Sequence, residues 1–85
     1  MKQFSYTIQD KDGIHARPAG ALVKKAKEFA STIIVSEDGK SAEMTKLMAL
    51  MSLGIKCGDT VTVSIEGPDE DKAAGEVEAL FSETI

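Results

Sequence analysis

The chain has 85 residues, enough for one domain with a single modest core and too few for two lobes with a cleft between them. Hydrophobic residues make up 42% and charged residues 28%, a composition typical of globular and not of disordered proteins. Because 14 acidic residues outnumber 10 basic ones and the formal net charge is −4, we do not expect nucleic acid to be a partner.

The cysteine and hydropathy patterns favour the cytoplasm. The one cysteine, Cys57, cannot form an internal disulfide, and a single thiol is typical of a reducing compartment. The apolar runs are too short to cross a membrane, and residues 1–10 lack the apolar core of a signal peptide. We therefore expect a cytoplasmic protein with no membrane insertion.

The first predicted elements are a strand and a helix. Apolar and polar side chains alternate over residues 4–8, the period of a half-buried strand. Residues 10–13 then indicate a turn. From Pro18 to Phe29 the apolar residues recur with helical spacing, so we expect a helix that begins within two residues of His15.

A hairpin and a short helix are predicted next. Residues 32–36 are rich in β-branched side chains, and the Asp-Gly pair at 38–39 is a strong hairpin signal that leads into a strand over residues 40–44. Thr45 is predicted to cap a short helix that ends near Gly54.

The clearest strand is TVTVSIE, residues 60–66, in which apolar and polar side chains alternate throughout. After a Gly-Pro-Asp break, Asp69 is predicted to cap a final helix with Glu70 and Asp71 in its first turn. These elements predict a single α+β domain over residues 1–85. Its sheet would be antiparallel or mixed, with all three helices on one side and the other face open.

The only histidine, His15, lies in the stretch DGIHARPAG, where Pro18 fixes a helix start. The first-turn amides of Ala16 and Arg17 would be unpaired donors at the positive end of the helix dipole, a site suited to an anion. Arg17 adds a planar fork that matches phosphate oxygens, and imidazole is a nucleophile. We hypothesise that His15 is phosphorylated, but the spacing fits equally a histidine that only caps a helix beside a solvated arginine.

The stretch GIHARPAG, with SEDGKSAEMTKLMALMSLGIKCGD, resembles HPr, the histidine-containing phosphocarrier family of the bacterial phosphoenolpyruvate-dependent sugar phosphotransferase system. The likeness runs over essentially the whole chain. It implies an open-faced β-sandwich with a four-stranded antiparallel sheet and three helices in the order βαββαβα. It further implies that His15 accepts a phosphoryl group on Nδ1, that Arg17 contacts the phosphoryl oxygens, and that Ala16, Arg17 and Pro18 form the phosphate-binding helix start.

The resemblance also implies a role and partners. Phosphorylated enzyme I would be the donor and the IIA domain of a sugar permease the acceptor, so the protein would be a monomeric carrier and not an enzyme. HPr kinase and transcriptional regulators are further partners that the resemblance leaves open. Beside the motif there is no metal cluster, second histidine or Gly-rich nucleotide loop, so we expect neither a metal nor another cofactor.

A docking surface for these partners is expected on two helices. Met48 and Met51 lie one turn apart and match family positions in a flat apolar patch, although methionine is also common in cores. Gly20 in mid-helix costs about 1 kcal/mol against alanine, which either a close partner approach or simple tolerance explains. The expected docking residues are Gly20, Lys24, Lys27, Leu47, Met48 and Met51.

Two positions depart from the family's pattern. Lys46 stands where HPr proteins of low-GC Gram-positive bacteria carry a regulatory serine that HPr kinase phosphorylates. Lysine cannot accept that phosphate, so we expect no regulation at Lys46 and keep Thr45 as the alternative acceptor. Asp12 replaces a neutral polar residue. Its carboxylate would repel a phosphohistidine or raise its tendency to transfer, unless Asp12 is only an ordinary turn residue.

Two other classes of function compete with the carrier. An enzyme that hydrolyses phosphate through a phosphohistidine would need a water-activating group and a substrate pocket, and the sequence shows neither. An HPr-like regulatory paralogue that acts by protein binding outside sugar transport would use the same fold and sometimes the same histidine. Loss of sugar uptake on deletion would favour the carrier, and normal uptake would favour the paralogue.

Overall fold

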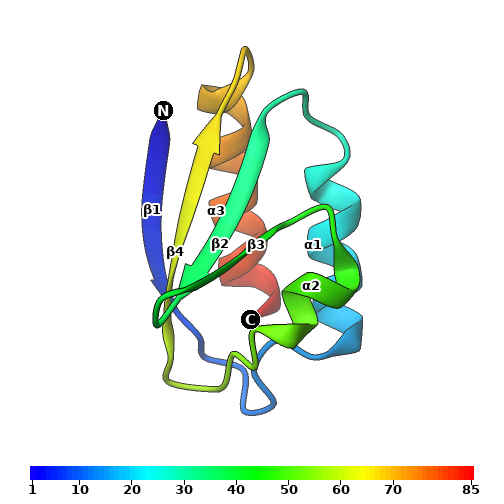
Figure 1. The fold of residues 1–85 in the computed structure, drawn as a ribbon, viewed down its shortest axis with the longest axis vertical. Helices are drawn as coiled ribbons and strands as arrows, with labels where there is room; N and C mark the ends of the chain where they lie inside the picture. Colours follow the sequence, from blue (N-terminus) through cyan, green and yellow to red (C-terminus); the bar gives the residue numbers. More distant parts are fainter.

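The computed structural model describes residues 1–85. Four strands and three helices follow one another in the predicted order βαββαβα (Figure 1). The strands are β1 (Lys2–Thr7), β2 (Thr32–Glu37), β3 (Lys40–Glu43) and β4 (Thr60–Glu66). The helices are α1 (Ala16–Ala26), α2 (Leu47–Ser52) and α3 (Glu70–Thr84).

The strands form one sheet in the order β1-β4-β2-β3, and every neighbouring pair is antiparallel. Strand β4 lies inside the sheet, where Val63 stands opposite Phe4 on one side and Val35 on the other. Strands β2 and β3 form the predicted hairpin. Its two turn residues, Asp38 and Gly39, both have positive φ, 52° and 80°, as a tight two-residue turn requires. The sheet is therefore antiparallel and not mixed.

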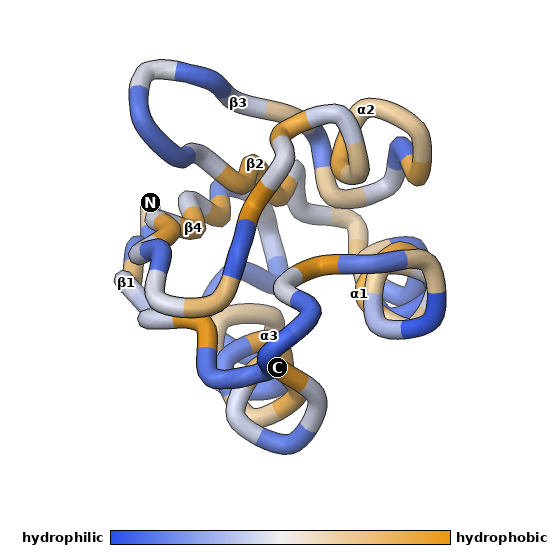
Figure 2. The backbone as a smooth tube through the Cα atoms, turned by 90° about the horizontal axis from the view of Figure 1, so that it is seen from below, coloured by the Kyte–Doolittle hydropathy of each residue, from blue (hydrophilic) through white to orange (hydrophobic).

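All three helices cover one face of the sheet, as the end-on view in Figure 2 shows. The side chains that alternate inward from β4 are fully buried, as is Phe81 of α3. Phe81 packs edge-on against Phe4 and Tyr6 of β1, with ring centroids 5.8 and 5.7 Å apart. The core thus lies between sheet and helices and leaves the polar face of the sheet open, which confirms the predicted α+β sandwich.

Two predicted helix limits are wrong by a few residues. The residue that precedes α2 is Lys46 and not Thr45, because the Lys46 carbonyl accepts the first helical hydrogen bond, from the Leu50 amide at 2.9 Å. Helix α1 ends at Ala26, before Phe29, because the amides of Glu28 and Phe29 bond three and not four residues back. The apolar period continues beyond the helix because Phe29 still packs against the core.

Asp69 precedes α3 as predicted, but its side chain does not cap the helix. Its carboxylate oxygens accept instead from the backbone amides of Ala30 and Ser31, at 2.9 and 3.0 Å, and from the Ser31 hydroxyl. Glu70 takes part in the local turn, because its carboxylate accepts the Gly67 amide at 3.2 Å. A tertiary contact has therefore displaced the local cap.

The longest helix, α3, has 15 residues, and none of the three helices combines the length and the apolar character needed to cross a membrane.

Candidate functional site at the start of the first helix

The loop that joins β1 to α1 is held by backbone contacts from distant parts of the chain. The amides of Gln9 and Asp10 donate to the main-chain oxygen of Ile85, at 2.6 and 2.9 Å. Gly13 has a φ of +66°, and a Cβ there would lie 2.2 Å from the carbonyl oxygen of Ile55. Only glycine therefore fits, and the loop enters α1 in a fixed position.

His15 is the residue just before α1, and its imidazole does not cap the helix. Its backbone is extended, with φ −104° and ψ −173°, and its carbonyl accepts the Ala19 amide at 2.9 Å. The side chain makes no capping hydrogen bond and is 41% exposed. Of the two interpretations left open by the spacing, the structure does not support a side chain that serves only as a cap.

The residues after His15 form the predicted helix start. Ala16 and Arg17 are exposed in the first turn, where backbone amides have no intrahelical acceptor, and Pro18 is buried beside them. The Arg17 guanidinium takes part in none of the six ion pairs in the structure. An anion at this end of α1 would thus meet free amides and a free guanidinium.

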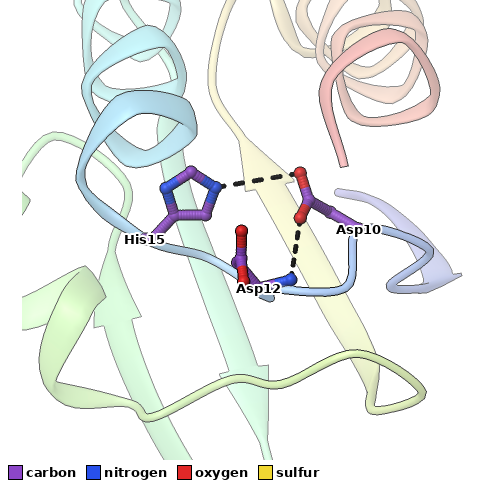
Figure 3. Close-up of side chains that lie close together, drawn as sticks. All are labelled: Asp10, Asp12 and His15. Carbon is purple, nitrogen blue, oxygen red and sulfur yellow. Dashed lines mark hydrogen bonds and ion pairs between the residues drawn. The ribbon is translucent and has the colours of Figure 1, made fainter.

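Two carboxylates lie beside the imidazole, and only one of them, Asp12, was expected from the sequence. The Nε2 atom of His15 is 3.8 Å from Oδ2 of Asp10, and the Asp12 amide donates to Oδ1 of Asp10 at 2.8 Å (Figure 3). The Asp12 side chain itself is exposed. The pattern Asp-x-Asp-Gly just before the histidine is a signal of such a turn, and it could have pointed to Asp10.

Asp10, Asp12 and His15 also form the one cluster of potential metal ligands, with one ligand atom from each within 4.8 Å of the others. This cluster was not expected from the sequence. Zinc takes imidazole nitrogen and carboxylate oxygen at about 2.0–2.2 Å, so its ligand atoms lie at most about 4.4 Å apart. The three side chains would have to draw together to hold such an ion.

The expected docking residues are mostly exposed on two helices that pack side by side, α1 and α2. Met48 is 75% exposed and Leu47 39% exposed, whereas Met51 is only partly exposed and packs against the core. A Cβ at Gly20 would meet no atom within 4 Å, so nothing within the chain requires glycine there. Lys24 and Lys27 are exposed, Lys24 within α1 and Lys27 directly after its last residue.

Residues 2–83 match the family described as PTS HPr component phosphorylation site. The chain belongs to the HPr family. An HPr relative, the phosphocarrier protein HPr of Lysinibacillus sphaericus, is 42% identical over 83 residues, which cover 98% of this chain and 94% of that protein. The crystal structure of HPr from Thermoanaerobacter tengcongensis is 38% identical and has a TM-score of 0.93, over 99% of this chain and 94% of that one. The resemblance found in the sequence and its implied fold are thus confirmed.

Dimers are found among HPr-like structures. An HPr dimer from T. tengcongensis is 38% identical, with a TM-score of 0.77 over 98% of this chain and 95% of that one. Crh, a catabolite repression protein of Bacillus subtilis described as a dimer with a swapping domain, is 34% identical, with a TM-score of 0.78 over 100% of this chain and 98% of that one. HPr-like proteins therefore include a regulatory relative and dimeric assemblies.

The family also agrees with the expectation that the protein is not an enzyme. HPr relatives are named phosphocarriers, and a carrier takes up and gives away the same group without turning over a substrate of its own. The small exposed site at His15 fits such a role.

Proposed function

We propose that this HPr protein accepts a phosphoryl group on Nδ1 of His15 from phosphorylated enzyme I and passes it to the IIA domains of sugar permeases. The observation that carries the proposal is the partly exposed, non-capping imidazole at the residue just before α1, followed by free amides and an unpaired arginine. Three equatorial phosphoryl oxygens carry the charge in transfer, and this helix start offers donors for them.

The orientation of the imidazole supports attack by Nδ1. The Nε2 atom faces Asp10, and Figure 3 shows the other ring nitrogen on the side of the ribbon that continues into α1. A phosphoryl group on that nitrogen would lie toward the amides of Ala16 and Arg17, with the carboxylates across the ring. Transfer then needs positioning and charge, most of which a docked partner supplies.

We propose that enzyme I and the IIA domains dock on the exposed residues of α1 and α2. Leu47 and Met48 expose apolar surface, and Gly20 leaves room for a close approach. Lys24 and Lys27 add positive charge at the far end of the helix that begins beside Arg17. This combination of a small apolar centre with basic residues beside it suits an acidic partner surface. It also suits a complex that dissociates after each transfer.

The experiment that tests the carrier is intact-mass spectrometry after incubation with enzyme I and phosphoenolpyruvate. We expect the wild type to gain one phosphoryl group, which acid removes, and His15→Ala to gain none. Addition of a IIA domain should return the wild type to its original mass. The proposal fails if neither protein gains mass, or if His15→Ala gains the same acid-labile group.

The second candidate is a regulatory HPr-like protein outside sugar transport, which the similarity to Crh favours. Deletion of the gene separates the two, because only loss of the carrier abolishes uptake of phosphotransferase sugars. Uptake at the wild-type rate, together with no phosphoryl gain in the mass experiment, would support the regulatory role.

We also propose that the carrier is a cytoplasmic monomer. Enzyme I and IIA domains are expected to use the surface around Met48, which a dimer at the same place would cover, and Cys57 is a free thiol. Sedimentation at micromolar concentration tests the assembly state. A stable dimer would contradict this part of the proposal and leave the phosphoryl chemistry untouched.

A further inference from the structure

Asp10 stands at the ring nitrogen of His15 that the proposed transfer does not use. Its Oδ2 atom is 3.8 Å from Nε2, a contact that is an ion pair only when the imidazole is protonated, and neither residue forms another ion pair. The two side chains are 28% and 41% exposed, so the pair is partly shielded from solvent. The carboxylate therefore acts on one ring nitrogen more than on the other.

The Asp10 carboxylate is held in place before any phosphoryl group arrives. Its Oδ1 atom accepts the Asp12 amide at 2.8 Å. The Asp10 carbonyl accepts the Gly13 amide, and the Asp10 amide donates to Ile85, both at 2.9 Å. With Oδ1 occupied and the backbone fixed at both ends, Oδ2 is the oxygen left to face the imidazole (Figure 3).

We infer that Asp10 is a positioning residue that keeps the proton of the neutral imidazole on Nε2 and so leaves the lone pair on Nδ1. A neutral imidazole carries one proton, and at 3.8 Å the Asp10 carboxylate acts through its charge, which favours the proton on the nearer nitrogen, Nε2. This inference rests on the proposed phosphorylation of His15 and explains why Nδ1 would be the nucleophile.

The transfer step then needs no general base. The Nδ1 lone pair forms the bond to phosphorus while the bond from phosphorus to the donor breaks, and the electron pair of that bond stays with the donor. The proton remains on Nε2, so the phosphorylated ring carries a positive charge that the Asp10 carboxylate compensates. Onward transfer reverses these changes, and the proton again stays in place.

The variant Asp10→Asn gives an unusually sharp test, because it should reverse the tautomer. The amide oxygen must stay on the Asp12 amide, since the opposite rotamer would bring two donors together. The NH₂ group then replaces Oδ2 beside Nε2 and favours a lone pair there, which places the proton on Nδ1. Asp10→Ala only removes the acceptor and should give a mixture.

The measurement is the ¹⁵N NMR spectrum of the His15 imidazole in the free protein, at a pH where the ring is neutral. We expect a mostly Nε2-protonated ring in the wild type, a smaller excess of Nε2–H in Asp10→Ala, and a majority of Nδ1–H in Asp10→Asn. Asp12→Asn removes a carboxylate of the same charge but leaves Oδ2 of Asp10 in place, and should retain the wild-type tautomer.

A tautomer ratio that is the same in wild type and Asp10→Asn would overturn the inference. So would an equal shift in Asp12→Asn, because general charge and not Asp10 would then be responsible. The rate of phosphoryl transfer from enzyme I should be highest for the wild type, lower for Asp10→Ala and lowest for Asp10→Asn. Failure of the wild type to gain a phosphoryl group would refute the proposed function alone, since the tautomer is measured without a donor.

Discussion

Asp69, the residue before α3, binds Ser31, the residue before β2, through two hydrogen bonds, from the Ser31 amide at 3.0 Å and from its hydroxyl. The amide of Ala30 donates to the second carboxylate oxygen at 2.9 Å. These contacts join the connection after α1 to the connection after β4, at the end of the sheet where β2 begins and β4 ends. The Asp69 side chain thus holds these two connections together.

Acid should weaken the hydrogen bonds that the Asp69 carboxylate accepts. The Ser31 hydroxyl, followed by the Ala30 amide, lowers the pKa of Asp69 from its ordinary value of 3.8. A lowered pKa in the folded state means that the contribution to stability is present above pH 3.8 and is lost as the pH falls through the folded-state pKa. We expect Asp69→Asn to lower Tm at pH 7, with the difference from the wild type closing in acid.

Thermal unfolding at a series of pH values from about 2 to 7 would measure this difference, with pH as the only variable. The control is Glu78→Gln, which removes an exposed carboxylate that forms no hydrogen bond or ion pair and should follow the wild type throughout. If Asp69→Asn and the wild type lose stability in parallel as the pH falls, the assigned role of the carboxylate is incorrect.

Arg17 should matter for phosphoryl transfer and not for stability. Arg17 is exposed and forms no ion pair, so Arg17→Ala removes no side-chain hydrogen bond or ion pair from the folded protein. Loss of a charge-assisted hydrogen bond to the phosphoryl oxygens should reduce kcat/KM of enzyme I for this protein roughly 10- to 100-fold. Arg17→Lys should recover only part of it, because lysine lacks the planar fork. Lys40→Ala, at the hairpin, is the matched charge control, and an equal loss there would point to net charge instead.

Gly20 and Gly75 form a matched pair of helical glycines. A methyl group added at either position would meet no atom within 4 Å, so alanine fits at both. Each substitution should raise the free energy of unfolding by about 0.4–1 kcal/mol in urea titrations, because glycine is the freer residue in the unfolded chain. Only Gly20→Ala should also raise the KM of enzyme I, since Gly20 is in the proposed docking surface. An unchanged KM would show that glycine at position 20 is only tolerated and has no role in docking.

Met44 and Met48 should separate core packing from docking. Met44 is fully buried and Met48 is 75% exposed. Met44→Ala should lower the free energy of unfolding by about 2–5 kcal/mol, whereas Met48→Ala should stay within about 0.5 kcal/mol of the wild type. Met48→Ala should instead raise the KM for enzyme I and for a IIA domain. A loss of stability in Met48→Ala similar to that of Met44→Ala would contradict the docking role.

Incubation with HPr kinase and ATP should leave the wild type without an acid-stable phosphoryl group, because Lys46 has no hydroxyl. Lys46 is exposed at the start of α2, so Lys46→Ser restores an accessible hydroxyl and should become a substrate. Mass spectrometry with peptide mapping measures both. Phosphorylation of the wild type at Thr45, abolished in Thr45→Ala, would show that the regulatory site lies one residue earlier than the family position.

Much of this architecture is local in origin and so was predictable. The alternation over residues 60–66 is set by strand geometry, and Pro18 fixes a helix start because its ring fits only a first turn. The Asp-Gly pair at 38–39 determines the hairpin because these two residues adopt the positive φ angles that a two-residue turn requires. Each of these signals depends on a few neighbouring residues and needs no knowledge of the rest of the chain.

The sequence by itself therefore determined the element order, the helix start at His15 and membership of the HPr family. Only the tertiary structure decided where carboxylates with several available partners would bind. Asp69 binds Ser31, 38 residues away in the chain, instead of capping its own helix, and the backbone amide of Asp10 is anchored by the main-chain oxygen of Ile85. A carboxylate binds whichever donors folding brings closest, and the folded positions of those donors are not encoded in local spacing.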